Sequence, residues 1–120
     1  MPLRSKLFAG DKALEACAAQ DSAHITLNAI GPHISKIQTA LFVLDEVSVA
    51  ARELQSQTYG PSTAAAVLAY KQKRRIINFG YQTQADNIVG KMTIAAMDAE
   101  MVIEEKLPPL RDPLDQPAST

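Results

Sequence analysis

Apolar residues recur along this chain at the three- and four-residue spacing that is typical of helices. The clearest stripe consists of Ile34, Ile37, Leu41 and Leu44, and it predicts a helix from about residue 32 to 47 with one face toward a core. Gln38 lies on the flank of this stripe. A polar residue in that place is expected to cap or brace a neighbouring loop.

Three further helices are predicted around the first one. The earliest covers about residues 11–20, with Asp11 as its cap and Leu14, Cys17 and Ala18 on its inner face. The other two cover about residues 61–78 and 91–106. Their expected inward residues are Thr63, Ala66, Val67, Tyr70 and Ile77, then Ile94, Met97 and Met101.

The stretches between these helices have weaker patterns. Residues 49–57 fit either an extension of the second helix or a separate short one. Residues 23–30 have no clear period, although Ile25 and Leu27 favour a short extended piece. A polar loop is expected over residues 82–88. The tail after residue 106 contains four prolines, so we expect it to be extended or mobile and not helical.

One short pattern occurs twice, over residues 59–67 and again over residues 89–97. Both copies read apolar-Gly-x-x-Thr-x-x-Ala-apolar, with the glycines at 60 and 90 and the threonines at 63 and 93. Glycine permits a tight connection, and Pro61 or Lys91 after it suits a first helical turn. Each threonine hydroxyl is expected to satisfy a backbone N–H at the helix start. The repeat therefore indicates a duplicated unit in which a loop leads into a helix.

Three blocks of sequence resemble the peptidoglycan-binding-like domain family over about residues 30–101. In order, the matching residues are Ile34, Ile37, Gln38 and Leu41; Gly60, Pro61, Thr63, Ala66, Val67 and Tyr70; and Asp86, Ile88, Val89, Gly90 and Thr93. Two family pairs differ here. The aromatic-Gln pair of the family is Tyr70-Lys71, and its Asp-Gly pair is Asp86-Asn87.

The resemblance implies an all-α fold with a three-helix core of the peptidoglycan-binding type, to which this chain adds an N-terminal helix. We expect an N-terminal extension over residues 1–29, the family domain over residues 30–106 and a Pro-rich tail over residues 107–120. The implied function is non-catalytic binding of bacterial cell-wall peptidoglycan. The alternative is a protein-docking or structural module on the same scaffold, either part of or delivered by a phage-like contractile injection apparatus of the type VI kind.

Five residues have the side chains that a shallow groove for a sugar-peptide polymer would use: Gln38, Tyr59, Tyr70, Asp86 and Asn87. Aromatic faces with fixed amide and carboxylate groups are suited to such a ligand. Each residue also has a structural interpretation. Tyr70 fits a half-buried core position, Gln38 a brace, and the Asp-Asn pair a turn.

Composition narrows the remaining function classes. The net charge is -1, which favours neither nucleic acid nor an anionic membrane. Lys71, Lys73, Arg74 and Arg75 fit a solvated helix end better than a polyanion site. His24 and His33 lack the spacing of a metal-ligand pair, and no catalytic constellation is recognisable. We therefore expect neither an enzyme nor a cofactor or metal site.

Cysteine usage and the start of the chain bear on the compartment. Cys17 is the only cysteine, which excludes an intrachain disulfide and fits a small buried side chain. The first residues lack the apolar run of a secretory signal, and no stretch has the length of a membrane span. We expect a chain that is cytoplasmic before any non-classical export and that acts at the periplasm or cell wall.

Overall fold

The computed structural model describes residues 3–20, 23–76 and 88–106. These residues form an all-α structure, and its helices are α1 (Lys12–Ala19), α2 (Pro32–Asp45), α3 (Ala51–Ser56), α4 (Pro61–Arg74) and α5 (Lys91–Lys106). The short α3 is a separate helix, which decides between the two interpretations of residues 49–57. Asp86, Asn87 and the whole tail lie outside the described residues.

The helix ends follow from local chemistry. Asp11 caps α1, since its carboxylate accepts a hydrogen bond from the Leu14 N–H at 3.1 Å. Proline is the first residue of both α2 and α4, where its missing N–H costs nothing. Arg75 has the left-handed conformation, with φ of 57°, so α4 ends at Arg74. The expected end near residue 78 is wrong, and Ile77 lies outside the described residues.

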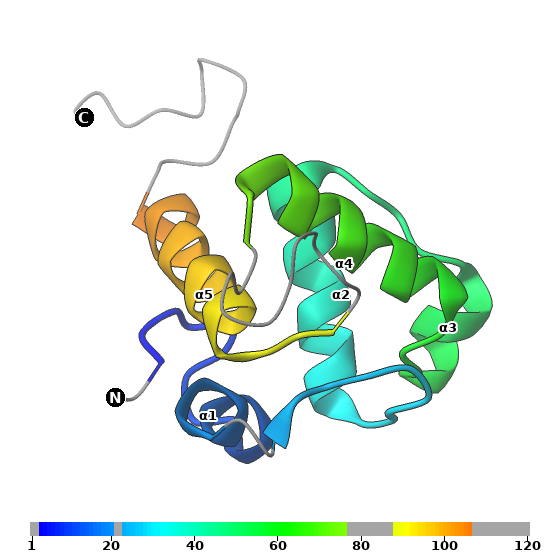
Figure 1. Ribbon diagram of the computed structural model, residues 1–120, viewed down its shortest axis with the longest axis horizontal. Coiled ribbons are helices and arrows are strands. Elements are labelled where there is room, and N and C mark those ends of the chain that lie inside the picture. Colours follow the sequence, from blue (N-terminus) through cyan, green and yellow to red (C-terminus); the bar gives the residue numbers. More distant parts are fainter. Residues whose placement is uncertain (1–2, 21–22, 77–87, 107–120) are drawn as a thin grey trace, which may run out of the picture.

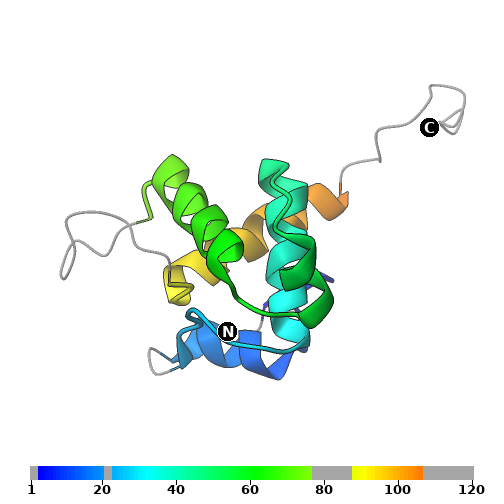
Figure 2. The same cartoon turned by 90° about the vertical axis from the view of Figure 1, so that its right-hand side faces the viewer.

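The helices pack so that α2 contacts both α4 and α5, while α1 contacts α5. Figure 1 shows α1 at the lower left, below α5, with α4 running from above α2 toward the right. Figure 2 shows the same helices turned by 90°, with α4 and α2 splayed apart above α1. The predicted inner stripe is confirmed at Ile34, Ile37 and Leu41, which are fully buried, whereas Leu44 is partly buried against the core.

The N-terminal residues contribute to the same core as the later helices. Phe8, Leu14 and Cys17 are fully buried, and the Cys17 thiol donates to the Val89 carbonyl at 3.3 Å. Ile25 pairs with Val89 in an isolated antiparallel bridge. The expected extended piece is therefore found at Ile25 and not at Leu27, which lies in a turn and is exposed.

Carboxylates hold the segment before α1. The Asp98 side chain on α5 accepts hydrogen bonds from the backbone N–H groups of Arg4 and Ser5, at distances from 2.8 to 3.1 Å. Glu105 accepts from Lys6 and Leu7 in the same way. Hydrogen bonds to charged acceptors are stronger than neutral ones, so α5 fixes the course of this segment.

Candidate functional site

The Gln38 side chain joins the first two sequence blocks. Its Nε2 donates to the Thr63 hydroxyl and to the Thr58 carbonyl, both at 3.1 Å, and lies 3.5 Å from the Glu53 carbonyl. Gln38 is only 2% exposed. It therefore connects α2 to the start of α4 and to α3, which agrees with the bracing role expected from the sequence.

Glu53 caps α4 from a different helix. Its carboxylate accepts the backbone N–H groups of Ser62 and Thr63, both at 2.9 Å, and the Thr63 hydroxyl at 2.7 Å. The expected capping role of the Thr63 hydroxyl is therefore wrong. The carboxylate has taken the free N–H groups, because a negative charge at a helix N-terminus satisfies them better than a hydroxyl does.

The same contacts set the ionisation of Glu53. Burial raises the pKa of this carboxyl, but the hydrogen bonds from Thr63 and Ser62 outweigh burial and lower its pKa to about 2. Glu53 therefore remains ionised while buried, with the start of α4 as its counter-charge.

Gly60 makes room for this arrangement. A Cβ atom at this position would lie 2.5 Å from the Glu53 Cδ and 2.7 Å from its Oε2. At Gly90, the second glycine of the repeat, the atom nearest to an added Cβ would be the His24 Nε2, at 3.1 Å. The two copies of the repeat both begin a helix, but only the first accommodates a buried carboxylate.

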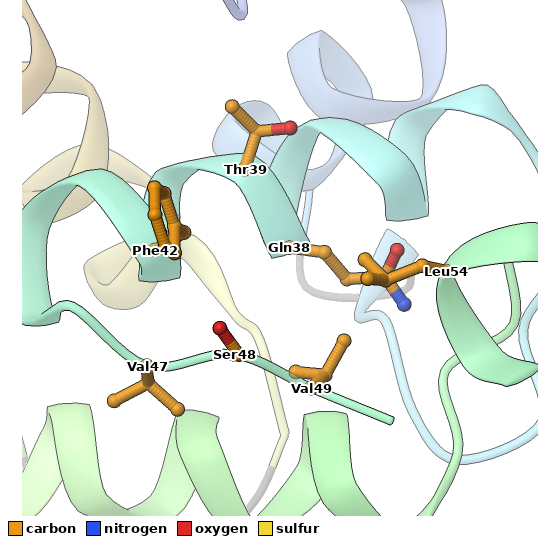
Figure 3. Close-up of a pocket in the computed structure, with 7 residues that line it drawn as sticks. All are labelled: Gln38, Thr39, Phe42, Val47, Ser48, Val49 and Leu54. Atoms are coloured by element: carbon orange, nitrogen blue, oxygen red, sulfur yellow. The ribbon is translucent and has the colours of Figure 1, made fainter. Parts of the chain in front are cut away.

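A groove opens beside this network, between α2, α3 and the segment that connects them (Figure 3). Its volume is about 320 Å³, and it is lined by Gln38, Thr39, Phe42, Val47, Ser48, Val49 and Leu54. None of these side chains carries a charge. Phe42 is 58% exposed and Leu54 is 45% exposed, so apolar surface faces solvent at the groove.

The two tyrosines proposed from the sequence are inside the core. Tyr59 and Tyr70 are both fully buried, so neither ring presents an open face. The Tyr70 hydroxyl donates to Glu100 Oε2 at 3.1 Å, and the Arg74 guanidinium lies 3.8 Å from the centre of its ring. Burial, together with the neighbouring Glu100 charge, raises the pKa of Tyr70 above its usual range.

Three of the basic residues at the end of α4, namely Lys71, Lys73 and Arg74, have partners within the protein. Arg74 bonds Glu100 at 2.6 and 2.7 Å and contacts Asp45 at 2.9 Å. Lys73 lies 3.6 Å from Asp45, and the buried Lys71 donates to the Ile88 carbonyl at 2.9 Å. These side chains join α4 to α2, to the middle of α5 and to Ile88 before α5. The solvated helix end expected from the sequence is therefore wrong for Lys71, which is buried.

The structure also bears on the cysteine, metal-site and membrane expectations from the sequence. Cys17 is buried, and burial raises the pKa of its thiol to about 11. Among the described residues, no group of three His, Cys, Asp or Glu side chains could hold a metal ion. None of the helices in the described ranges is long and apolar enough to cross a membrane.

Of the five residues proposed from the sequence, Gln38 alone is found at the groove among those that the structure describes. Sequence reasoning missed Phe42, Leu54 and Glu53. Phe42 is apolar but lies outside the apolar stripe of its helix. This position was the signal in the sequence that could have indicated an exposed apolar side chain. Glu53 gave no signal, because its partners are brought to it only by folding.

Comparison with family models, curated proteins and solved structures finds no match to this chain.

Proposed function

We propose that this chain is a non-catalytic module that binds bacterial cell-wall peptidoglycan through the groove between α2 and α3. The observation that carries the proposal is the position of this groove. It opens beside Gln38, the polar residue of the first family-like block, and the Gln38 amide reaches Thr63 of the second block at 3.1 Å. The resemblance to the family indicates the class of ligand, and the groove is the surface at which we propose that this ligand binds.

The chemistry of the groove suits a neutral, partly apolar ligand. Its wall offers the exposed Phe42 and Leu54 side chains and the Ser48 hydroxyl. Ligand sites of this kind combine apolar walls with a few fixed polar groups. The partnered basic residues at the end of α4 are not needed for this binding.

Co-sedimentation of the purified protein with cell-wall sacculi tests the proposal. We expect the wild type to be retained, Phe42→Ala to lose about tenfold or more in affinity, and raised salt to have little effect, because the groove is uncharged. Ile103→Ala is the matched control, since Ile103 is 59% exposed on α5 and does not line the groove.

If folded wild-type protein stays in solution, the wall-binding proposal fails, and the protein-docking alternative gains support from the same apolar groove. If salt alone releases the protein, binding depends on charge and the groove is not responsible.

A further inference from the structure

One polar atom of the Gln38 amide, Oε1, has no hydrogen-bond partner among the described residues. Its Nε2 faces the Thr58 carbonyl, the Thr63 hydroxyl and, more distantly, the Glu53 carbonyl. The Thr63 hydroxyl gives its own hydrogen to Glu53, so it accepts from Gln38. These acceptors fix the orientation of the amide, because a rotated amide would set its oxygen against two carbonyl oxygens.

The Gln38 Oε1 atom is buried, and no described residue donates a hydrogen bond to it. A buried acceptor without a donor is costly, and this one belongs to a side chain that lines the groove. A ligand that brings an N–H group to this oxygen would satisfy it. The atom therefore favours a donor, and an amide N–H is a neutral donor that matches the uncharged wall.

Leu54 lines the same groove as Gln38. In the view of Figure 3 the Leu54 side chain lies in front of the Gln38 amide, and both residues line the same groove. Leu54 is 45% exposed, so its side chain is free to change rotamer on a fast timescale. Contact between a ligand and the buried oxygen would require such a movement of a side chain that lines the groove.

We propose that the groove binds the alanine-containing peptide part of peptidoglycan, with a main-chain N–H of the peptide donating to Gln38 Oε1. This inference rests on the proposed function and narrows its ligand. The small methyl groups of alanine would pack on Phe42, Val47 and Val49, which line the groove. The volume of about 320 Å³ is at the small end for ligand sites and suits a short segment of peptide.

The glycan part of the polymer fits the same wall less well. Sugar rings carry several hydroxyl groups, and each one buried without a partner is unfavourable. The groove offers few hydroxyl partners, namely Thr39 and Ser48, and the Thr39 hydroxyl already donates to the Ser35 carbonyl at 2.9 Å. The few polar groups of this wall therefore match one amide better than a saccharide.

The test uses two probes prepared from sacculi by an amidase that separates peptides from glycan strands. Each probe is titrated into isotope-labelled protein and followed by NMR. We expect the soluble peptides, and not the peptide-free glycan strands, to shift the backbone amides of Ser48 and Val49 and the side-chain amide of Gln38. The peptides should also release the protein from sacculi.

A variant whose side chain fills the groove provides a second test. Ser48→Phe should weaken peptide binding about tenfold or more, while Gln72→Phe, at an exposed position on α4, should leave it unchanged. A synthetic acetylated alanine dipeptide should bind more weakly after N-methylation of its amides, because the donor is then lost. The spectrum of each variant shows whether it is folded, and the methylated probe needs no change in the protein.

The outcomes separate this inference from the proposed function. Retention on sacculi together with shifts caused by glycan strands alone would overturn the inference and leave wall binding intact. Peptide-induced shifts at the groove without retention on sacculi would overturn wall binding and leave the peptide groove intact. Equal binding of the methylated and unmethylated probes would overturn the role of Gln38 Oε1.

Discussion

At the residue scale, a buried carboxylate and a glycine depend on each other. Glu53 approaches the start of α4 so closely that a Cβ atom at position 60 would lie 2.5 Å from its Cδ. The carboxylate in turn accepts two backbone N–H groups of α4. Gly60 is needed here for space and not for a left-handed conformation, since its φ is -99°.

Replacing each glycine of the repeat should therefore give unequal effects. We expect Gly60→Ala to lower the free energy of unfolding by about 2 kcal/mol or more, because the Glu53 carboxylate must move. Gly90→Ala should cost less than about 1 kcal/mol, since its neighbour is the exposed His24 side chain. Urea denaturation of both variants measures the difference, and equal losses would contradict the packing argument.

The depressed pKa of Glu53 predicts a pH dependence. The folded-state pKa is about 2, below the ordinary value of 4.5, so this carboxylate stabilises the protein above pH 4.5. That contribution is lost as the pH falls toward 2, because the unfolded chain takes up the proton first. Glu53→Gln should be less stable by about 2 kcal/mol at neutral pH.

Comparing the two proteins by urea denaturation from pH 7 to pH 2.5 checks this prediction. Other carboxylates titrate in both proteins, so their effects cancel in the difference. The advantage of the wild type should shrink below pH 4.5. A difference that stays constant over this range would show that Glu53 does not hold a depressed pKa.

At the element scale, ionic contacts join the ends of α2 and α4 to the middle of α5. Arg74 of α4 lies between Asp45 at the end of α2 and Glu100 of α5, and it stacks on the Tyr70 ring. The side chain of Asp45 is only 4% exposed. Without Arg74, two carboxylates would lose the cation between them, and Asp45 would keep its longer contact with Lys73, at 3.6 Å.

We expect Arg74→Ala to lower the free energy of unfolding by about 2 kcal/mol, because it leaves poorly solvated negative charges without their cation. Lys73→Ala is the control and should change stability by less than about 0.5 kcal/mol, since the Lys73 side chain is 64% exposed. Thermal denaturation at the same salt concentration compares the stability of the two variants. Similar losses in both variants would mean that Asp45 is held equally by either cation.

The helices themselves were largely predictable from the sequence, whereas some of their ends were not. The apolar spacing of Ile34, Ile37 and Leu41 placed α2, and Asp11 was recognisable as a cap. The end of α4 depends on the left-handed conformation of Arg75. A side chain of this type gives no local stop signal, because glycine or asparagine is the usual residue there.

At the scale of the whole molecule, residues from the first 29 positions complete the core. Phe8, Leu14 and Cys17 are fully buried, and Ile25 is paired with Val89. Asp98 and Glu105 bind the backbone before α1. The family-like region is thus covered by a segment that the resemblance does not include.

A fragment of residues 30–106 should therefore fail to fold cooperatively. It would expose the apolar surface that Phe8, Leu14 and Ile25 now cover, and Phe8→Ala in the full chain should by itself cost about 3–5 kcal/mol. Thermal unfolding by circular dichroism and the dispersion of NMR signals measure both effects. A fragment with a sharp transition near that of the full chain would show that the N-terminal segment is a separate addition.

The sequence by itself determined the helical content, the inward stripes and the two glycine-led helix starts, because these depend on periodicity and on local backbone preferences. Only the tertiary structure decided that Glu53 caps α4, that Tyr59 and Tyr70 are buried and that Phe42 lies open beside Gln38. These features depend on how separate elements pack against one another. Burial and hydrogen-bond partners of this kind are set by packing, which no local pattern records.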